Sequence, residues 1–127
     1  MKIYCAGQMT GKTFTEINSY FSNVKRELEL LKYEVLIPLV GTGHAATKRA
    51  EWMVKTADLI FVNLTDTKRV SIGSVSELAW AHTYKKHSVL AMEENNIHTH
   101  PFILEMADIR VFTYEEAINY LKYLMHN

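Results

Sequence analysis

Residues 2–13 read KIYCAGQMTGKT and contain the features that decide the fold. Residues 2–6 form a short, mostly apolar run, which is typical of a β-strand, and a loop with two glycines follows directly. From Phe14 onward apolar residues recur at spacings of three and four, as they do on one face of an amphipathic helix. A strand, a glycine loop and a helix in this order indicate the opening of a βαβ unit.

The rest of the chain continues this alternation. Strands are predicted at 33–39, 58–64, 88–92 and 109–112, and helices at 45–57, 74–86 and 114–125. The run DLIFVNL at 58–64 is so continuously apolar that both its faces should be covered, which places it at the centre of the sheet. The order predicts an α/β fold: a single-domain Rossmann-like three-layer sandwich over 1–127, with helices on both faces of a mostly parallel sheet of four or five strands.

Composition narrows the class of protein. Among 127 residues, 14 Lys and Arg balance 14 Asp and Glu, so the chain lacks the positive field that drives non-specific binding to nucleic acid. No apolar run approaches the roughly 20 residues that span a bilayer, and the N-terminus lacks the apolar stretch of a signal peptide. We therefore expect a cytoplasmic protein with a small-molecule partner and no membrane partner. The single cysteine, Cys5, excludes an internal disulfide and a zinc site built on several cysteines.

The first loop allows two functional interpretations, a P-loop or a site for another anionic ligand, and a structural one. In open parallel sheets, ligands bind beyond the carboxyl ends of the strands, here the loops at 7–13, 38–44 and 65–74. The stretch AGQMTGKT at 6–13 fits a permissive Walker A pattern, which would make the protein a small P-loop phosphotransferase, although no apolar strand ends in a magnesium-binding Asp. The structural interpretation is that the glycines merely permit a tight turn. Under either functional interpretation, the backbone amides of 7–12 and the side chain of Lys12 form a candidate anion site.

The second informative stretch is SIGSVSELAWAH at 71–82. Ser74 and Glu77 have the spacing of a capping box at a helix start, which is a purely structural role. The functional interpretation places Glu77 in the first helical turn, where the helix dipole favours its ionised form. Such a carboxylate, next to a Ser- and Gly-rich loop, is a candidate nucleophile.

Three stretches, KIYCAG at 2–7, EWMVKTADLIFV at 51–62 and SIGSVSELAWAH, resemble the nucleoside 2-deoxyribosyltransferase-like superfamily in order and spacing. This superfamily includes the 2'-deoxynucleoside 5'-phosphate N-hydrolases. The resemblance implies a domain that is usually dimeric or larger. It also implies cleavage of the N-glycosidic bond of a 2'-deoxynucleoside or its 5'-monophosphate, without a metal or an organic cofactor.

The resemblance also assigns roles to residues. Glu77 matches the glutamate that attacks C1' and forms a covalent glycosyl-enzyme, a role that suits a carboxylate facing an oxocarbenium-like sugar. Tyr4 and Gly7 match a Tyr-x-Ala-Gly element that lines the site. Ser71 and Gly73 match the loop that holds the 5'-phosphate. Further candidate substrate contacts are Gln8, Gly11, Lys12 and Ser74.

One position departs from the family pattern. The family usually carries an acidic residue in the second helix, at the position where this chain has Arg49, nine positions before Asp58. Arg49 is a candidate phosphate contact or ion-pair partner of Glu77, which favours a charged nucleotide. Glu51 would replace the missing acid only if the helix were rotated by about 200°, and Asp66 is the other candidate catalytic acid. If no second acid serves, the alternative is a non-catalytic nucleotide-binding protein, a sensor or sequestering agent.

The remaining expectations concern outcome, metal and assembly. Because the candidate cations favour an anionic substrate, hydrolysis of a 5'-monophosphate is preferred to deoxyribosyl transfer. His98 and His100 in IHTHP are interpreted as part of a solvated loop, so no metal site is predicted. Trp52 and Trp80 are expected in the core or at a subunit interface, and a homodimer or larger homo-oligomer is the expected assembly.

Overall fold

The computed structural model describes residues 1–38 and 45–126. Along the chain it has β1 (Lys2–Gly7), α1 (Phe14–Leu30), β2 (Glu34–Leu36), α2 (Ala46–Thr56), β3 (Leu59–Asn63), α3 (Ile72–Thr83), β4 (His87–Ala91), α4 (Pro101–Met106), β5 (Ile109–Val111) and α5 (Tyr114–His126). The strands form one parallel sheet in the order β2-β1-β3-β4-β5. The apolar strand β3 lies at its centre, as predicted.

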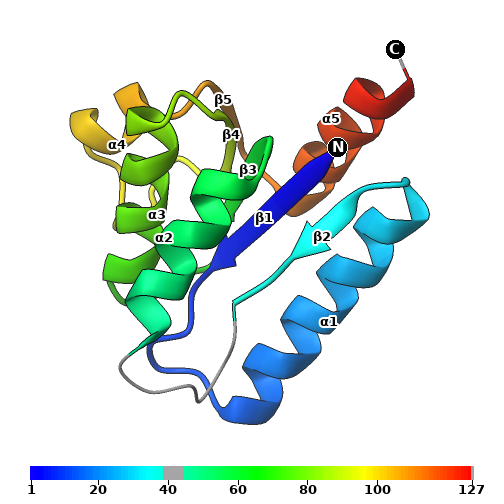
Figure 1. Ribbon diagram of the computed structural model, residues 1–127. Coiled ribbons are helices and arrows are strands. Elements are labelled where there is room, and N and C mark those ends of the chain that lie inside the picture. The colour runs from blue at the N-terminus through cyan, green and yellow to red at the C-terminus, as the bar shows by residue number, and fades with distance from the viewer. Residues whose placement is uncertain (39–44, 127) are drawn as a thin grey trace.

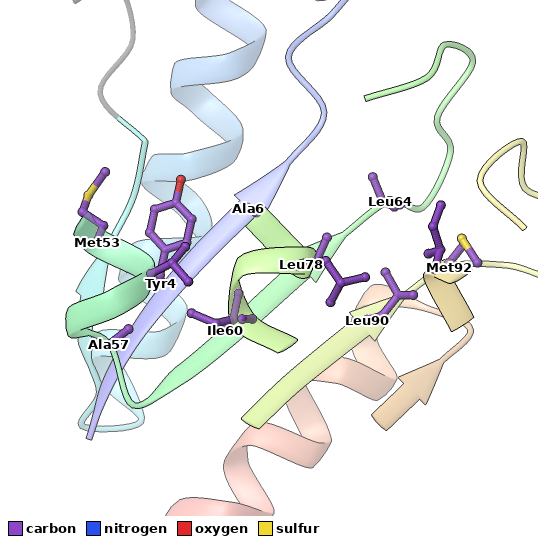
Figure 2. Packing of buried hydrophobic residues seen from close by; sticks show 13 residues of the cluster. Tyr4, Ala6, Met53, Ala57, Ile60, Leu64, Leu78, Leu90 and Met92 are labelled. Carbon is purple, nitrogen blue, oxygen red and sulfur yellow. The ribbon is translucent and has the colours of Figure 1, made fainter. Parts of the chain in front are cut away.

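Helices cover both faces of this sheet (Figure 1). Successive side chains of a strand point to opposite faces, so β1 contributes to two cores. Tyr4 and Ala6 pack under α2, α3 and α4 with residues such as Met53 and Leu78 (Figure 2). Their neighbours in β1 pack under α1 and α5, in a cluster that includes Ile3, Cys5, Val24, Leu28, Ala117 and Leu121. The predicted single-domain Rossmann-like sandwich is confirmed.

The strand order fixes where a ligand can approach. An order of 2-1-3-4-5 is one of the doubly wound arrangements, and its crevice lies where the connections reverse direction, beyond the carboxyl ends of β1 and β3. The loop at 38–44, which was expected to border this crevice, lies outside the described residues from 39 to 44. Within the described parts of the chain, no helix is both long and apolar enough to cross a membrane.

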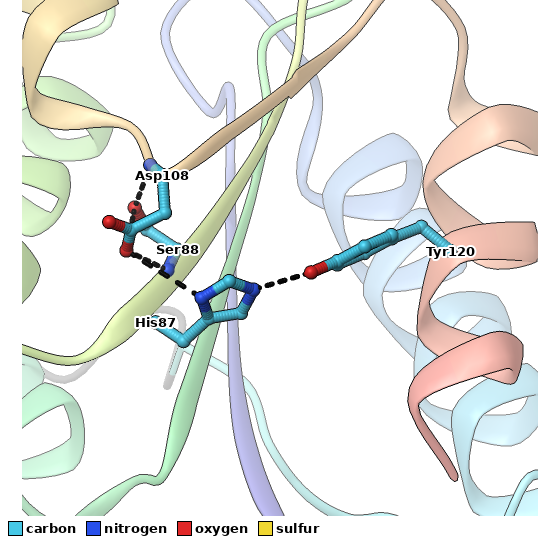
Figure 3. Close-up of polar contacts among 4 residues, drawn as sticks. All are labelled: His87, Ser88, Asp108 and Tyr120. Atoms are coloured by element: carbon cyan, nitrogen blue, oxygen red, sulfur yellow. Dashed lines mark hydrogen bonds and ion pairs between the residues drawn. The ribbon is translucent and has the colours of Figure 1, made fainter. Parts of the chain in front are cut away.

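Side-chain hydrogen bonds link neighbouring strands at the opposite, amino-terminal edge of the sheet. The Asp58 carboxylate accepts the Lys2 amide at 2.8 Å, and the Asp108 carboxylate accepts the Ser88 amide at 2.9 Å. His87 adds a contact of 2.7 Å to the Tyr120 hydroxyl, which joins β4 to α5 (Figure 3). Each aspartate precedes one strand and holds the start of its neighbour, so these carboxylates set the register of the sheet.

Strand β2, Glu34–Leu36, is shorter than the predicted 33–39, and two further elements differ more from the prediction. Helix α3 begins at Ile72 rather than residue 74, with Ser71 as N-cap and no side-chain cap, so the structural alternative, a capping box of Ser74 and Glu77, is wrong. Helix α4 was not predicted, and the preceding segment is not a solvated loop throughout, because His98 is only 2% exposed. These two errors are linked, because His98 hydrogen-bonds to the start of α3.

Candidate functional site

A pocket of about 410 Å³ lies between α2 and α3, over the sheet face that carries Tyr4. Its volume is within the range of small-molecule sites. Strand β1 supplies Tyr4, α2 supplies Arg49 and Met53, and α3 supplies Gly73 and Glu77. The site is thus assembled from residues as far apart in the sequence as Tyr4 and Glu77.

Glu77 lies one turn further into α3 than predicted, because the helix starts earlier, and it is 8% exposed. The first-turn amides therefore do not explain its charge state, and the expected stabilisation of the carboxylate by the helix end was wrong. Burial instead raises the pKa of Glu77 to about 7, and the nearby Tyr4 hydroxyl opposes this rise only in part. A carboxyl group that titrates near neutrality is typical of catalytic sites.

Tyr4 and Glu77 face each other in a poorly solvated environment. Burial, and then the negative charge of Glu77, raise the pKa of Tyr4 far above its ordinary value, so its hydroxyl stays protonated. The Tyr4 hydroxyl lies close enough to the Glu77 carboxyl to lower its pKa, but within residues 1–38 and 45–126 neither that hydroxyl nor Oε2 of Glu77 has a partner that meets full hydrogen-bond geometry. Buried polar atoms are nearly always hydrogen-bonded in folded proteins. Two unsatisfied oxygens lining one pocket therefore indicate a place for a polar ligand.

Arg49, the residue that departs from the family pattern, also lines this pocket and is half-buried. A guanidinium group and a buried carboxyl thus share one cavity. Glu51 has a different role, because its carboxylate accepts the Tyr84 hydroxyl at 2.6 Å and ties α2 to α3. It is not among the described residues that line the pocket.

A second, smaller hollow of about 90 Å³ contains four of the other predicted residues, Gln8, Gly11, Lys12 and Asp66. Thr10, Lys68 and Arg69 also line it. Asp66 is exposed, and its amide donates to Glu93 at 3.0 Å. The structure therefore places Asp66 among cations and does not bring it into the pocket of Glu77. The first loop borders both hollows, because Met9 lines the larger one.

The glycine loop at 7–13 does not match the predicted anion site in full, because one of its backbone amides is already hydrogen-bonded within the loop. Gly11 has a φ of +82°, which favours glycine, and a Cβ there would lie 3.3 Å from Cδ of Arg69. The amide of Lys12 is already bonded to the Met9 carbonyl at 3.1 Å. Thr13 caps α1 and accepts the Glu16 amide at 3.1 Å. The Thr13 hydroxyl, which ends the Walker-like motif, is therefore used to cap α1.

The other predicted contacts have mostly packing roles. Gly7 is buried at the end of β1, and a Cβ there would lie 3.3 Å from the Tyr20 ring. Ser71 and Ser74 are buried, and their hydroxyls are 2.8 Å apart. Neither serine is among the described pocket-lining residues, whereas Gly73 is.

Sequence reasoning missed several residues of these sites. Trp80, expected in the core or at an interface, lines the larger pocket together with Met53. Lys68 and Arg69 stand in a loop that was expected at the sheet's carboxyl edge, so their paired charges were a usable signal. His98 gave no such signal, because its contact with Ser71 exists only in the fold. The described residues contain no group of three or more His, Cys, Asp or Glu placed to hold a metal ion.

Comparisons with known proteins agree with this architecture. The chain is similar to the CMP N-glycosidase BcmB of Clostridium botulinum, with a TM-score of 0.68 and 17% identity over 98% of this chain and 97% of that one. It is also similar to a 3-dehydroquinate dehydratase-like protein of Bifidobacterium longum, with a TM-score of 0.56 and 11% identity over the same shares. No protein-family model matches the chain, and no curated protein matches it in sequence. The predicted resemblance to the nucleoside 2-deoxyribosyltransferase-like superfamily is confirmed for the fold.

Proposed function

We propose that the protein cleaves the N-glycosidic bond of a 2'-deoxynucleoside 5'-monophosphate or deoxynucleoside, with Glu77 as the nucleophile. The observation that carries this proposal is the buried Glu77 carboxyl, whose Oε2 lacks a hydrogen-bond partner among the described residues and which lines a ligand-sized pocket with Tyr4. The fold shared with a CMP N-glycosidase supports it. That protein's substrate is a nucleoside monophosphate, so ribonucleotides belong in the tests.

The chemistry follows from one bond exchange. As the bond between C1' and the base nitrogen breaks, the electron pair leaves with the base and positive charge develops on the sugar. The ionised Glu77 stabilises this charge and then forms a bond from its carboxylate oxygen to C1'. In the second step water attacks C1', the bond from C1' to the carboxylate oxygen breaks, and the proton that water loses balances the one that the departed base takes up. The carboxylate is thereby restored and the free sugar phosphate is released. An acceptor base in place of water would give a new nucleotide, which is transfer rather than hydrolysis.

Arg49 favours a phosphorylated substrate. Its guanidinium belongs to the same cavity as the proposed nucleophile, and arginine binds phosphate through two parallel hydrogen bonds. Lys12, Lys68 and Arg69 in the neighbouring hollow form a second cationic group, which we propose attracts anionic substrates to this edge of the sheet. Tyr4, which stays protonated, is proposed to donate a hydrogen bond to the substrate or to Glu77.

A non-catalytic nucleotide-binding protein is the second candidate, and one observation favours it. Among the described residues that line the pocket, Glu77 is the only carboxylate, and Asp66 lies in the other hollow. No second acid in the described lining is available to protonate the departing base. A purine whose ring nitrogens take up a proton from water would need less help than a pyrimidine.

The test separates these functions directly. The protein is incubated with each of the four deoxynucleoside monophosphates, the matching deoxynucleosides and CMP, and free base is measured by chromatography, with and without an acceptor base. Free base without acceptor supports hydrolysis, and a new nucleotide supports transfer. Loss of either activity in Glu77→Ala, with the melting temperature retained, supports the assigned nucleophile. A nucleotide that raises the melting temperature without any base release would instead establish the binding protein.

A further inference from the structure

His98 lies at the centre of a buried polar network that joins three elements. Its Nε2 accepts the amide of Ser71 at 2.8 Å, and its Nδ1 lies 2.8 Å from Oδ1 of Asn96. Asn96 also donates to the carbonyl of Leu64 at 2.6 Å, and Thr67 donates to the same carbonyl at 2.9 Å. Leu64 directly follows β3, Asn96 lies beyond β4, and Ser71 begins α3. The network therefore fastens the start of α3 to the carboxyl ends of the two central strands.

The contacts fix the protonation state of the ring. An imidazole nitrogen that accepts an amide proton carries no proton itself, so the proton of neutral His98 is on Nδ1. From there it is donated to Oδ1 of Asn96, which also accepts the His98 amide at 2.9 Å. His98 thus offers one acceptor and one donor, and both are used.

Helix α1 shows what this acceptor replaces. At the start of α1, the N-cap amide of Thr13 is accepted by the carboxylate of Glu16, three residues later in the same helix, at 2.8 Å. In α3 the equivalent position is Ser74. Its hydroxyl accepts a hydrogen bond from the Ser71 hydroxyl and not from the Ser71 amide. His98, 27 residues away in the sequence, supplies the missing acceptor.

We propose that His98 is a positioning residue, which holds the first turn of α3 through the Ser71 amide and thereby sets Gly73 and Glu77 in the pocket. This inference rests on the proposed function for its kinetic consequence. Gly73 is only two residues beyond the held amide, and its Cβ position would lie 3.7 Å from Oε1 of Glu77. A displaced first turn changes this distance directly. Misplacement of a reacting group by about 1 Å can cost on the order of 100-fold in rate.

The hydrogen bond from the Ser71 amide to His98 depends on pH and is weakened only toward acid pH. Protonated His98 would present a second N–H to the Ser71 amide, so the hydrogen bond is lost on acidification. Burial lowers the pKa of His98, which keeps the ring neutral near pH 7. The titratable and charged groups around it are Glu93, which is hydrogen-bonded to Asn96, Arg110, which lies near Glu93, and His100. His98 and His100 line a hollow of about 300 Å³ together with Ile103. Burial is the cause of the lowered pKa of His98, and the neighbouring charges do not reverse this direction.

The experiment compares three variants by kcat and KM for base release. His98→Leu removes donor and acceptor, and kcat should fall on the order of 10- to 100-fold with a smaller change in KM. His98→Gln can accept from Ser71 and donate to Asn96 through its amide, so it should restore most of kcat. His100→Asn, two positions away, keeps an N-cap side chain on α4 and should leave kcat unchanged. In the wild type, kcat should fall in two stages toward acid pH, first as Glu77 takes up a proton and then, by no more than the loss seen in His98→Leu, as His98 takes one up; His98→Gln should show only the first stage.

A ligand-free measurement separates this inference from the proposed function. Nuclear magnetic resonance should show nitrogen–nitrogen coupling between Ser71 and His98 across their hydrogen bond. In His98→Leu, the pKa of Glu77 should move from about 7 toward its ordinary value as the loosened turn admits water. If the protein releases no base but the coupling and the altered Glu77 pKa are found, the positioning role stands without the glycosidase. An unaltered Glu77 pKa in a folded His98→Leu variant, or equal loss of kcat in His98→Leu and His98→Gln, would overturn the inference.

Discussion

Burial makes the ionised form of the Glu77 side chain unfavourable. Its carboxyl is almost fully enclosed, and its pKa of about 7 means that ionisation at neutral pH works against the low polarity of the pocket. A group kept for packing alone would be replaced by an amide or an apolar side chain at no loss. Retention of a strained carboxyl is expected where its charge is used in chemistry.

Glu77→Gln should therefore stabilise the protein in a pH-dependent way. The folded-state pKa of Glu77, about 7, lies above the ordinary 4.5, so the folded state binds the proton more tightly and loses stability as pH rises from 4.5 through 7. The amide mimics the protonated form at every pH. We expect the variant to be more stable than wild type by on the order of 3 kcal/mol at pH 8, and nearly equal to it at pH 4. Urea unfolding at both pH values measures this.

The control for that experiment is Glu105→Gln, which removes an exposed carboxylate from α4. Its free energy of unfolding should stay within about 0.5 kcal/mol of wild type. Equal stabilities of wild type and Glu77→Gln at pH 8 would contradict a buried, strained Glu77.

Substitution of Gly73 should change activity without lowering stability. A methyl group at this position would meet Oε1 of Glu77 at 3.7 Å, an ordinary contact distance. Alanine is the better helix former by up to about 1 kcal/mol, so Gly73→Ala should be at least as stable as wild type in urea. Its kcat/KM should nevertheless fall, because the methyl group occupies space in front of the carboxylate.

Gly7→Ala is the matched comparison. Its Cβ would approach the Tyr20 ring to 3.3 Å at a buried position, so this variant should lose stability. Unchanged kcat/KM in Gly73→Ala would show that substrate does not pass this side of Glu77.

At the scale of elements, the two helix starts explain which boundaries can be predicted. Helix α1 begins at Phe14, as its apolar spacing predicted, and its cap partners, Thr13 and Glu16, are three residues apart and therefore also visible in the sequence. Helix α3 starts earlier than expected, because its N-cap amide is held by His98 from beyond β4. Local capping rules read only the first kind of signal. Helix α4 was missed for a related reason: His100 caps it through a ring nitrogen rather than a hydroxyl or carboxylate.

Thr13→Ala tests whether the cap of α1 is only structural. The hydroxyl of Thr13 accepts the Glu16 amide, so its removal should cost about 1 kcal/mol of unfolding free energy. The kcat for base release should be unchanged, since Glu77 lies on another helix. A large loss of activity without a loss of stability would instead assign the Thr13 hydroxyl to ligand binding, as the Walker-like motif suggested. Thr13→Ser keeps the cap and serves as the control.

At the scale of the whole molecule, the sheet order decides which predicted residues meet. Tyr4 and Glu77 were predicted from separate motifs, and they share a pocket because β1 is near the sheet centre and α3 packs over the same face. Lys12 and Asp66 also come from loops at the carboxyl edge, yet they line a different hollow. Topology places loops at an edge, but the direction of each side chain depends on packing that the sequence does not display. The same limit applies to Ser71 and Ser74, which turn inward and bond to each other.

The face formed by α2, α3 and α4 leaves large apolar side chains exposed, and we propose that a second copy of the chain covers them. Trp52 on α2 is 61% exposed, Ile72 on α3 is 75% and Phe102 on α4 is 73%. Exposed apolar residues that gather on one face mark interaction sites more often than scattered ones do. Because Ile72 also lines the pocket of Glu77, a partner on this face would narrow the pocket entrance. Sedimentation velocity should therefore show a dimer, and Trp52→Glu should shift it to monomer and raise KM.

Exposed apolar residues elsewhere provide the control for this last experiment. Tyr123 is 60% exposed and belongs to α5, which covers the opposite face of the sheet from α2, α3 and α4, so Tyr123→Glu should leave the dimer intact. A wild-type monomer at all concentrations would refute the dimer and require that the pocket be complete in one chain. A dimer that Tyr123→Glu disrupts and Trp52→Glu does not would move the interface to the α1 and α5 face, where it would leave the entrance to the Glu77 pocket unchanged.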